Sequence, residues 1–128
     1  RIKMDKIKDY IQKSLPLLEH SRTSDNFELE EKTSKLLIVV ANLSSFVYDL
    51  ESTLTEARAI EKALYSDISK KAPDDKYQSI KRFVETNSQY IEAQQFCAET
   101  ENSLSYLSSM KEVFLNGHIM FRQFSRSQ

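Results

Sequence analysis

Hydrophobic positions recur every three or four residues along most of the chain, a pattern typical of α-helices that pack along one face. Between about residues 26 and 72, two seven-residue series interleave, and neither Gly nor Pro interrupts them. Glu61 is the only charged member of either series. This rhythm predicts one long helix with a coiled-coil seam. The series are Leu36, Leu43, Leu50, Ala57 and Leu64, and Val40, Val47, Leu54, Glu61 and Ile68.

The residues before this helix predict a short helix and a linker. Apolar residues fall roughly on one face from about residue 2 to 15, and Pro16 disturbs the end of that helix. A polar stretch over residues 20–26 follows. Ser24 and Asp25 are candidate N-caps of the long helix, with Glu28 three residues after Asp25.

A second long helix is predicted from about residue 75 to 116. Pro73 ends the first long helix, and Asp74 or Asp75 can cap the next one. Gly117, the only glycine, is a natural C-cap. The segment 118–124 is then either a further short helix or a continuation. The apolar series of this helix are Phe83, Tyr90, Cys97 and Leu104, and Ala93, Leu107 and Phe114.

The composition supports an all-α fold in a single domain over residues 1–128. One Gly and two Pro in 128 residues are too few for the turns of an all-β fold. We expect a long antiparallel helical hairpin with a short N-terminal helix. Each long helix of about 45 residues would span about 65–70 Å, whereas a compact domain of this size measures about 30–35 Å. Such a rod cannot cover its apolar stripes alone, so we expect a homo-oligomeric bundle.

The C-terminal segment, about residues 113–124, is the candidate assembly surface. Chain ends fray unless they are tied down, and this one is apolar. We expect it to dock on a neighbouring subunit; packing within its own chain is the alternative. The candidate oligomerisation residues are Val113, Leu115, Ile119, Phe121 and Phe124.

Several kinds of chemistry lack the residues they need. His20 and His118 stand alone, without the spacing of metal ligands, so no metal is expected. Cys97 lies in an apolar stripe, and one glycine cannot build a phosphate-binding loop. We expect no enzyme and no cofactor. A single Cys, no visible signal peptide and a longest apolar run of six residues predict a cytoplasmic protein without a membrane partner.

Positive charge is concentrated around the junction of the two long helices. The net charge is −1, but residues 62–82 sum to +3 and residues 49–61 sum to −3. Tyr65, Tyr77 and Phe83 lie among these cations, a mixture that suits the phosphates and bases of single-stranded DNA. Ordinary solvated lysines at a helix end are the alternative. The candidate DNA contacts are Arg58, Lys62, Lys70, Lys71, Lys76, Lys81 and Arg82.

Between Lys111 and Phe124 the chain has a pattern of a basic residue, spaced hydrophobes, Arg and Phe. In this C-terminal pattern above all, the chain resembles the UvsY-like recombination mediators of T-even-type bacteriophages. The run from Arg58 to Ser66 and the pair Phe96–Cys97 are further similarities. In the first of these runs only Arg58 and Lys62 are basic, and Glu61 lies between them.

The resemblance implies a ring-shaped homo-oligomer that assembles through its C-terminal helices. Such a protein would bind single-stranded DNA in the cytoplasm of the phage host. It would cooperate with the single-strand-binding protein and help to load a RecA-like recombinase. The alternative is a non-enzymatic coiled-coil adaptor, in a virion or scaffold, that binds only proteins.

Overall fold

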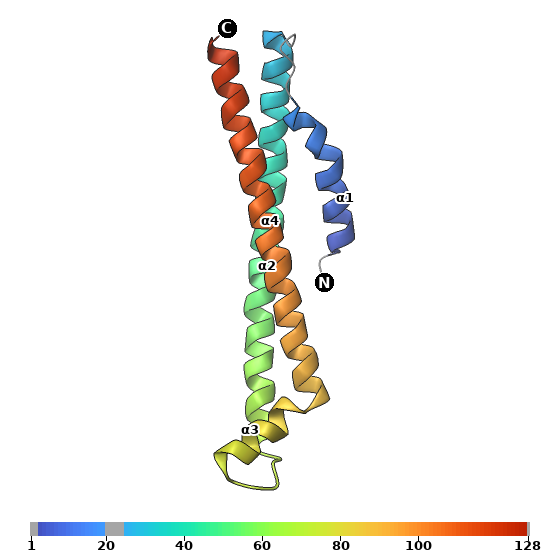
Figure 1. Ribbon diagram of the computed structural model, residues 1–128, viewed down its shortest axis with the longest axis vertical. Helices are drawn as coiled ribbons and strands as arrows, with labels where there is room; N and C mark the ends of the chain where they lie inside the picture. Colours follow the sequence, from blue (N-terminus) through green and yellow to red (C-terminus); the bar gives the residue numbers. More distant parts are fainter. Residues whose placement is uncertain (1–2, 20–24, 128) are drawn as a thin grey trace. The chain divides into compact units, whose positions relative to one another are not determined.

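The computed structural model describes residues 3–19 and 25–127, and all regular structure within them is helical. This confirms the all-α prediction. In chain order the elements are α1 (Met4–Ser14), the short 3₁₀ helix η1 (Leu15–Leu18), α2 (Asn26–Ser69), α3 (Tyr77–Glu85) and α4 (Ser88–Ser127) (Figure 1).

The long helix α2 begins and ends close to the predicted positions. The backbone N–H of Glu28 donates to Asp25 Oδ1 at 2.7 Å, so Asp25 caps the helix as expected. Ser24, the other candidate cap, lies outside the described residues. The last helical residue is Ser69, shortly before Pro73.

The single helix expected over about 75–116 is two helices in the structure. The break falls after Glu85, and Asn87 starts a new helix. The side-chain oxygen of Asn87 accepts hydrogen bonds from the backbone N–H groups of Gln89 and Tyr90, at 2.9 and 3.2 Å. Asn87 therefore acts as an N-cap for α4, a role that Asn fills readily.

The prediction that Gly117 ends a helix is wrong. Gly117 lies inside α4 with an ordinary negative φ, and the helix continues to Ser127. The segment 118–124 is thus a continuation. A Cβ built at Gly117 would collide with the end of the Leu18 side chain. Because glycine has no side chain, η1 can pack closely against α4 at this position.

The chain divides into two compact units, and both long helices contribute to each. The first unit comprises Arg1–Asp49 and Leu104–Gln128, and the second comprises Leu50–Ser103.

In the first unit, α1 packs on residues from both long helices. The ring of Tyr10 meets Phe46 edge-on, with centroids 6.2 Å apart, and the Tyr10 hydroxyl accepts a hydrogen bond from Asn42. The Lys8 ammonium lies 5.8 Å from the ring centroid of Tyr106 on α4. Apolar residues with no exposed surface form the centre of this unit: Leu29, Leu36, Leu43, Leu107, Phe114 and Phe121.

In the second unit, α3 packs on the end of α2 and the start of α4. Val84 of α3 is fully buried and shares a cluster with Ile68 and Tyr90. Four half-buried side chains surround this cluster: Leu64, Tyr65, Ile80 and Phe83.

The predicted heptad positions of α2 are largely buried. Val47, Glu61 and Leu64 are the half-buried exceptions. Leu37 and Ile38, which widen the apolar pattern, remain 51% and 60% exposed. By length and composition α2 also contains a stretch apolar enough to span a membrane, but the core helix of a soluble protein passes the same test.

Candidate nucleic-acid interface

All seven predicted DNA contacts lie in the second unit, and all are exposed. Arg58 and Lys62 stand on α2, and Lys70 and Lys71 follow its last residue. The remaining three belong to α3 and its start: Lys76, Lys81 and Arg82.

Two of these seven cations have an acidic partner in the second unit. Arg58 Nη2 lies 2.8 Å from Glu101 Oε1, and Lys81 Nζ lies 4.0 Å from Glu85 Oε1. Both pairs are solvent-exposed, so each contributes at most about 1 kcal/mol. Within the described part of the chain, the other five form no ion pair: Lys62, Lys70, Lys71, Lys76 and Arg82.

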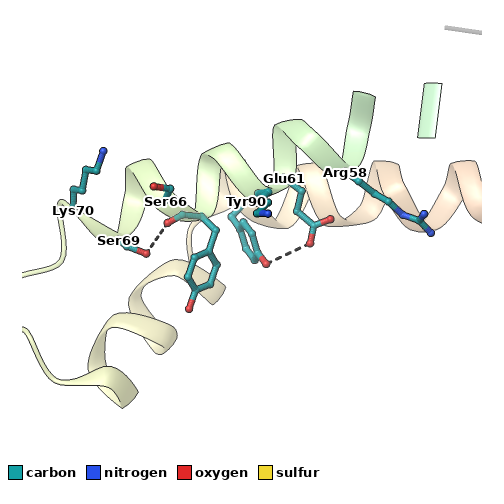
Figure 2. A pocket seen from close by; sticks show the side chains of 8 residues that line it. Arg58, Glu61, Ser66, Ser69, Lys70 and Tyr90 are labelled. Carbon is teal, nitrogen blue, oxygen red and sulfur yellow. Dashed lines mark hydrogen bonds between the residues drawn. The ribbon is translucent and has the colours of Figure 1, made fainter. Parts of the chain in front are cut away.

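An open groove of about 770 Å³ runs beside the last turns of α2. Figure 2 shows Arg58 and Lys70 at its opposite ends, with Glu61 and Tyr90 between them. At 1.5 Å per residue, Arg58 and Lys70 are about 18 Å apart along the helix. Its lining consists of Arg58, Glu61, Lys62, Tyr65, Ser66, Ser69, Lys70 and Tyr90.

The helical repeat explains this grouping. Arg58, Lys62, Tyr65 and Ser69 follow one another at steps of four, three and four residues, which places them on one side of α2. The hydroxyl of Ser69 donates to the carbonyl oxygen of Tyr65 at 2.6 Å, so it stays close to the helix backbone.

Tyr90 forms the wall of the groove that α4 contributes. Its hydroxyl donates to Glu61 Oε1 at 3.4 Å and accepts a hydrogen bond from Gln94 at 3.3 Å. Burial raises the pKa of Tyr90, and the negative charge of Glu61 raises it further. The ring also meets Tyr65 edge-on, with centroids 5.7 Å apart. Tyr90 therefore remains a neutral phenol near pH 7.

The three aromatic residues near the basic cluster have different environments. Tyr77, at the first position of α3, is 69% exposed. Tyr65 is half-buried in the groove, and Phe83 packs against the core cluster. A base could therefore stack on Tyr77 or reach Tyr65, whereas Phe83 serves mainly the fold.

Cys97 is buried, as its place in the apolar series predicts. Burial raises the pKa of its thiol, and a hydrogen bond and the charge of nearby Glu61 add to that effect. A thiol held in its protonated form is a poor nucleophile.

The candidate assembly residues divide into exposed and buried members. Val113, Leu115 and Phe124 are 44%, 36% and 36% exposed, and Ile119 is half-buried. Phe121 has no exposed surface within its own chain. Its ring is thus already covered within the subunit, whereas the other four residues keep apolar surface that a second subunit could cover.

His118 is also engaged within the first unit. Its Nδ1 lies 2.9 Å from the carbonyl oxygen of Thr33, which connects α4 to α2. His20 lies outside the described residues. Among the residues that are described, no three His, Cys, Asp or Glu side chains are grouped to hold a metal ion.

The hydrophobic pattern of the sequence indicates neither the groove nor several exposed apolar side chains. Glu61 was noted as the exception in its heptad series, which was the one available signal of a polar site. Tyr90 lies on another helix, and only the fold brings it there. Exposed apolar residues not singled out for assembly include Phe27 and Met120.

Comparisons of the chain with protein-family models, with curated proteins and with solved structures found no match.

Proposed function

We propose that the chain binds single-stranded DNA as a homo-oligomer and acts as a recombination mediator. The observation that carries the DNA-binding part is the set of five cations without an acidic partner in the described chain, two of which line the groove: Lys62 and Lys70. Phosphates would replace the counterions of these side chains, and the released counterions favour binding.

The placement of these residues around an exposed turn suits a single strand. Lys71 and Lys76 flank the turn between α2 and α3, and the exposed ring of Tyr77 follows immediately. A stacked base and neighbouring phosphates could be held together there without sequence-specific contacts, as is usual for proteins that bind single strands.

The proposed assembly rests on apolar side chains left exposed in the first unit. Leu37, Ile38 and Val113 are each more than two-fifths exposed. Apolar side chains gathered on a surface commonly mark a protein interface. We propose that α2 and α4 form an antiparallel hairpin and that several hairpins associate into a bundle, which a ring would close. Val113, Leu115, Ile119 and Phe124 are the proposed contacts at the C-terminal end.

The mediator role comes from the resemblance in the sequence. In that role the oligomer would hold single-stranded DNA covered by the single-strand-binding protein and help a RecA-like recombinase to load. In the proposed function the chain performs no catalysis, needs no cofactor and works in the cytoplasm.

A protein-binding adaptor is the second candidate, and one observation favours it. The second unit carries ten acidic and seven basic residues, so the basic cluster lies on an acidic background. An adaptor would use the exposed apolar residues and bind no DNA.

Alanine substitution of Lys70, Lys71, Lys81 and Arg82 tests the proposal. We expect loss of oligo-dT binding with an unchanged oligomer mass, because these exposed side chains support no core. The matched control removes four exposed cations elsewhere: Lys6, Lys13, Lys35 and Arg126. Unchanged affinity of the first variant at low salt would contradict the assignment.

A further inference from the structure

Glu61 is the one acidic side chain in the lining of a groove that also holds Arg58, Lys62 and Lys70. In a groove that bound phosphates alone, a carboxylate would weaken binding by repulsion. A ligand that fits this lining should carry a hydrogen-bond donor opposite Glu61 and negative charge on either side of it.

We infer that Glu61 accepts a hydrogen bond from the exocyclic amino group of a nucleobase while neighbouring lysines hold the phosphates. The groove would thus favour single strands whose bases carry that group, such as cytosine, over thymine. This inference rests on the proposed binding of single-stranded DNA and adds a base preference to it.

The Glu61 carboxylate has the capacity for this role. It is half-exposed, and the hydrogen bond from the Tyr90 hydroxyl to its Oε1 is long, at 3.4 Å. The thiol of Cys97 also lies within hydrogen-bonding reach of this carboxylate. Because an ionised carboxylate offers about four acceptor sites on two oxygens, these contacts leave room for a base.

The rest of the groove provides for the other parts of a nucleotide. Lys62 is the next residue along α2, and Lys70 directly follows the last residue of that helix, so both cations lie in the same groove lining as the carboxylate. The half-buried ring of Tyr65, one turn after Glu61, offers an aromatic surface to the base.

Cytosine and thymine present opposite groups at the same position of the ring. Cytosine carries an amino donor there, whereas thymine carries a carbonyl acceptor that a carboxylate repels. A charge-assisted hydrogen bond at a partly exposed site predicts about three- to tenfold tighter binding of oligo-dC than of oligo-dT.

The experiment compares fluorescence anisotropy of labelled oligo-dC and oligo-dT of equal length with the full chain and with Glu61→Leu. Leu suits a heptad position, so the variant should fold, which its helical circular dichroism checks. We expect the dC preference to fall to about one, with tighter dT binding. Glu61→Gln, which retains a neutral acceptor, should keep part of the preference.

Glu56→Gln is the matched control, because Glu56 is an exposed acid of α2 outside the groove lining. It should leave the ratio of the two affinities unchanged. Salt-sensitive binding of both oligonucleotides with equal affinity, or a dC preference that survives Glu61→Leu, overturns the inference and leaves the proposed function standing. Failure of both oligonucleotides to bind overturns the two together.

Discussion

Truncation of Phe121 distinguishes a ring covered by its own chain from a ring covered by a neighbour. In the structure Phe121 has no exposed surface, and its ring centroid lies 6.3 Å from that of Phe124. Replacing a buried Phe by Ala removes its apolar contacts and leaves a cavity, at a cost of about 3–5 kcal/mol. Because a domain of this size is stable by about 5–15 kcal/mol, Phe121→Ala should remove a large share of its stability.

Urea unfolding, followed by the circular dichroism signal of the helices, measures this loss of stability. With a slope of about 2 kcal/mol per molar urea, the midpoint should fall by about 2 M. Phe124→Ala is the control. Its ring is 36% exposed, so about 1–2 kcal/mol of burial is lost and the midpoint should fall about half as far.

Protein concentration separates the two explanations. If Phe121 packs within its subunit, the difference in stability between variant and wild type stays constant as protein concentration changes. If a second chain covers the ring, the variant dissociates more readily and the difference varies with concentration. A concentration-dependent loss, or a smaller loss for Phe121→Ala than for Phe124→Ala, would refute the reasoning.

Three further predictions concern the cap, the glycine and the pH dependence. Asn87→Ala should destabilise the chain by about 1 kcal/mol in urea unfolding, and Asn87→Asp should restore most of it; no loss would mean that the cap is dispensable. Gly117→Ala should raise the free energy of unfolding by about 1 kcal/mol in a Leu18→Ala background, and by less in the wild type, where the new Cβ meets Leu18. Equal increases in the two backgrounds of this double-mutant cycle would disprove the contact between residues 18 and 117. Burial raises the pKa of Cys97 and of Tyr90 above their ordinary values of 9.0 and 10.0, so these groups ionise at lower pH in the unfolded chain than in the folded one. The free energy of unfolding should therefore fall as the pH rises above about 9. A free energy of unfolding that does not change over this pH range would contradict the prediction.

Local signals in the sequence predicted the elements that local interactions determine. The cap at Asp25, the end of α2 before Pro73 and the buried positions of its heptads follow from residues close together in the chain. The seven candidate DNA contacts lie in one unit because they are close in sequence, at the end of α2 and on α3.

The features that depend on distant contacts could not be read in the same way. Glycine is the residue type that most often follows the end of a helix, but Gly117 lies inside α4. There the side chain of Leu18, almost a hundred residues earlier, occupies the space that a Cβ would need. Asn87 is of a residue type that favours N-caps, but the apolar series that continue on both sides of it predicted one unbroken helix. Phe121 likewise continues the apolar series of Leu107 and Phe114, but the series does not indicate whether its ring packs in its own chain or against a second one.

The most direct test of the proposed function is the salt dependence of oligo-dT binding, measured by anisotropy on a sample whose mass light scattering reports. If five cations each meet a phosphate, affinity should fall about a hundredfold between about 50 and 200 mM salt, and the bound species should be a multimer. A well-formed multimer that binds no oligo-dT at low salt, or whose binding is indifferent to salt, would contradict the account and favour the protein-binding adaptor.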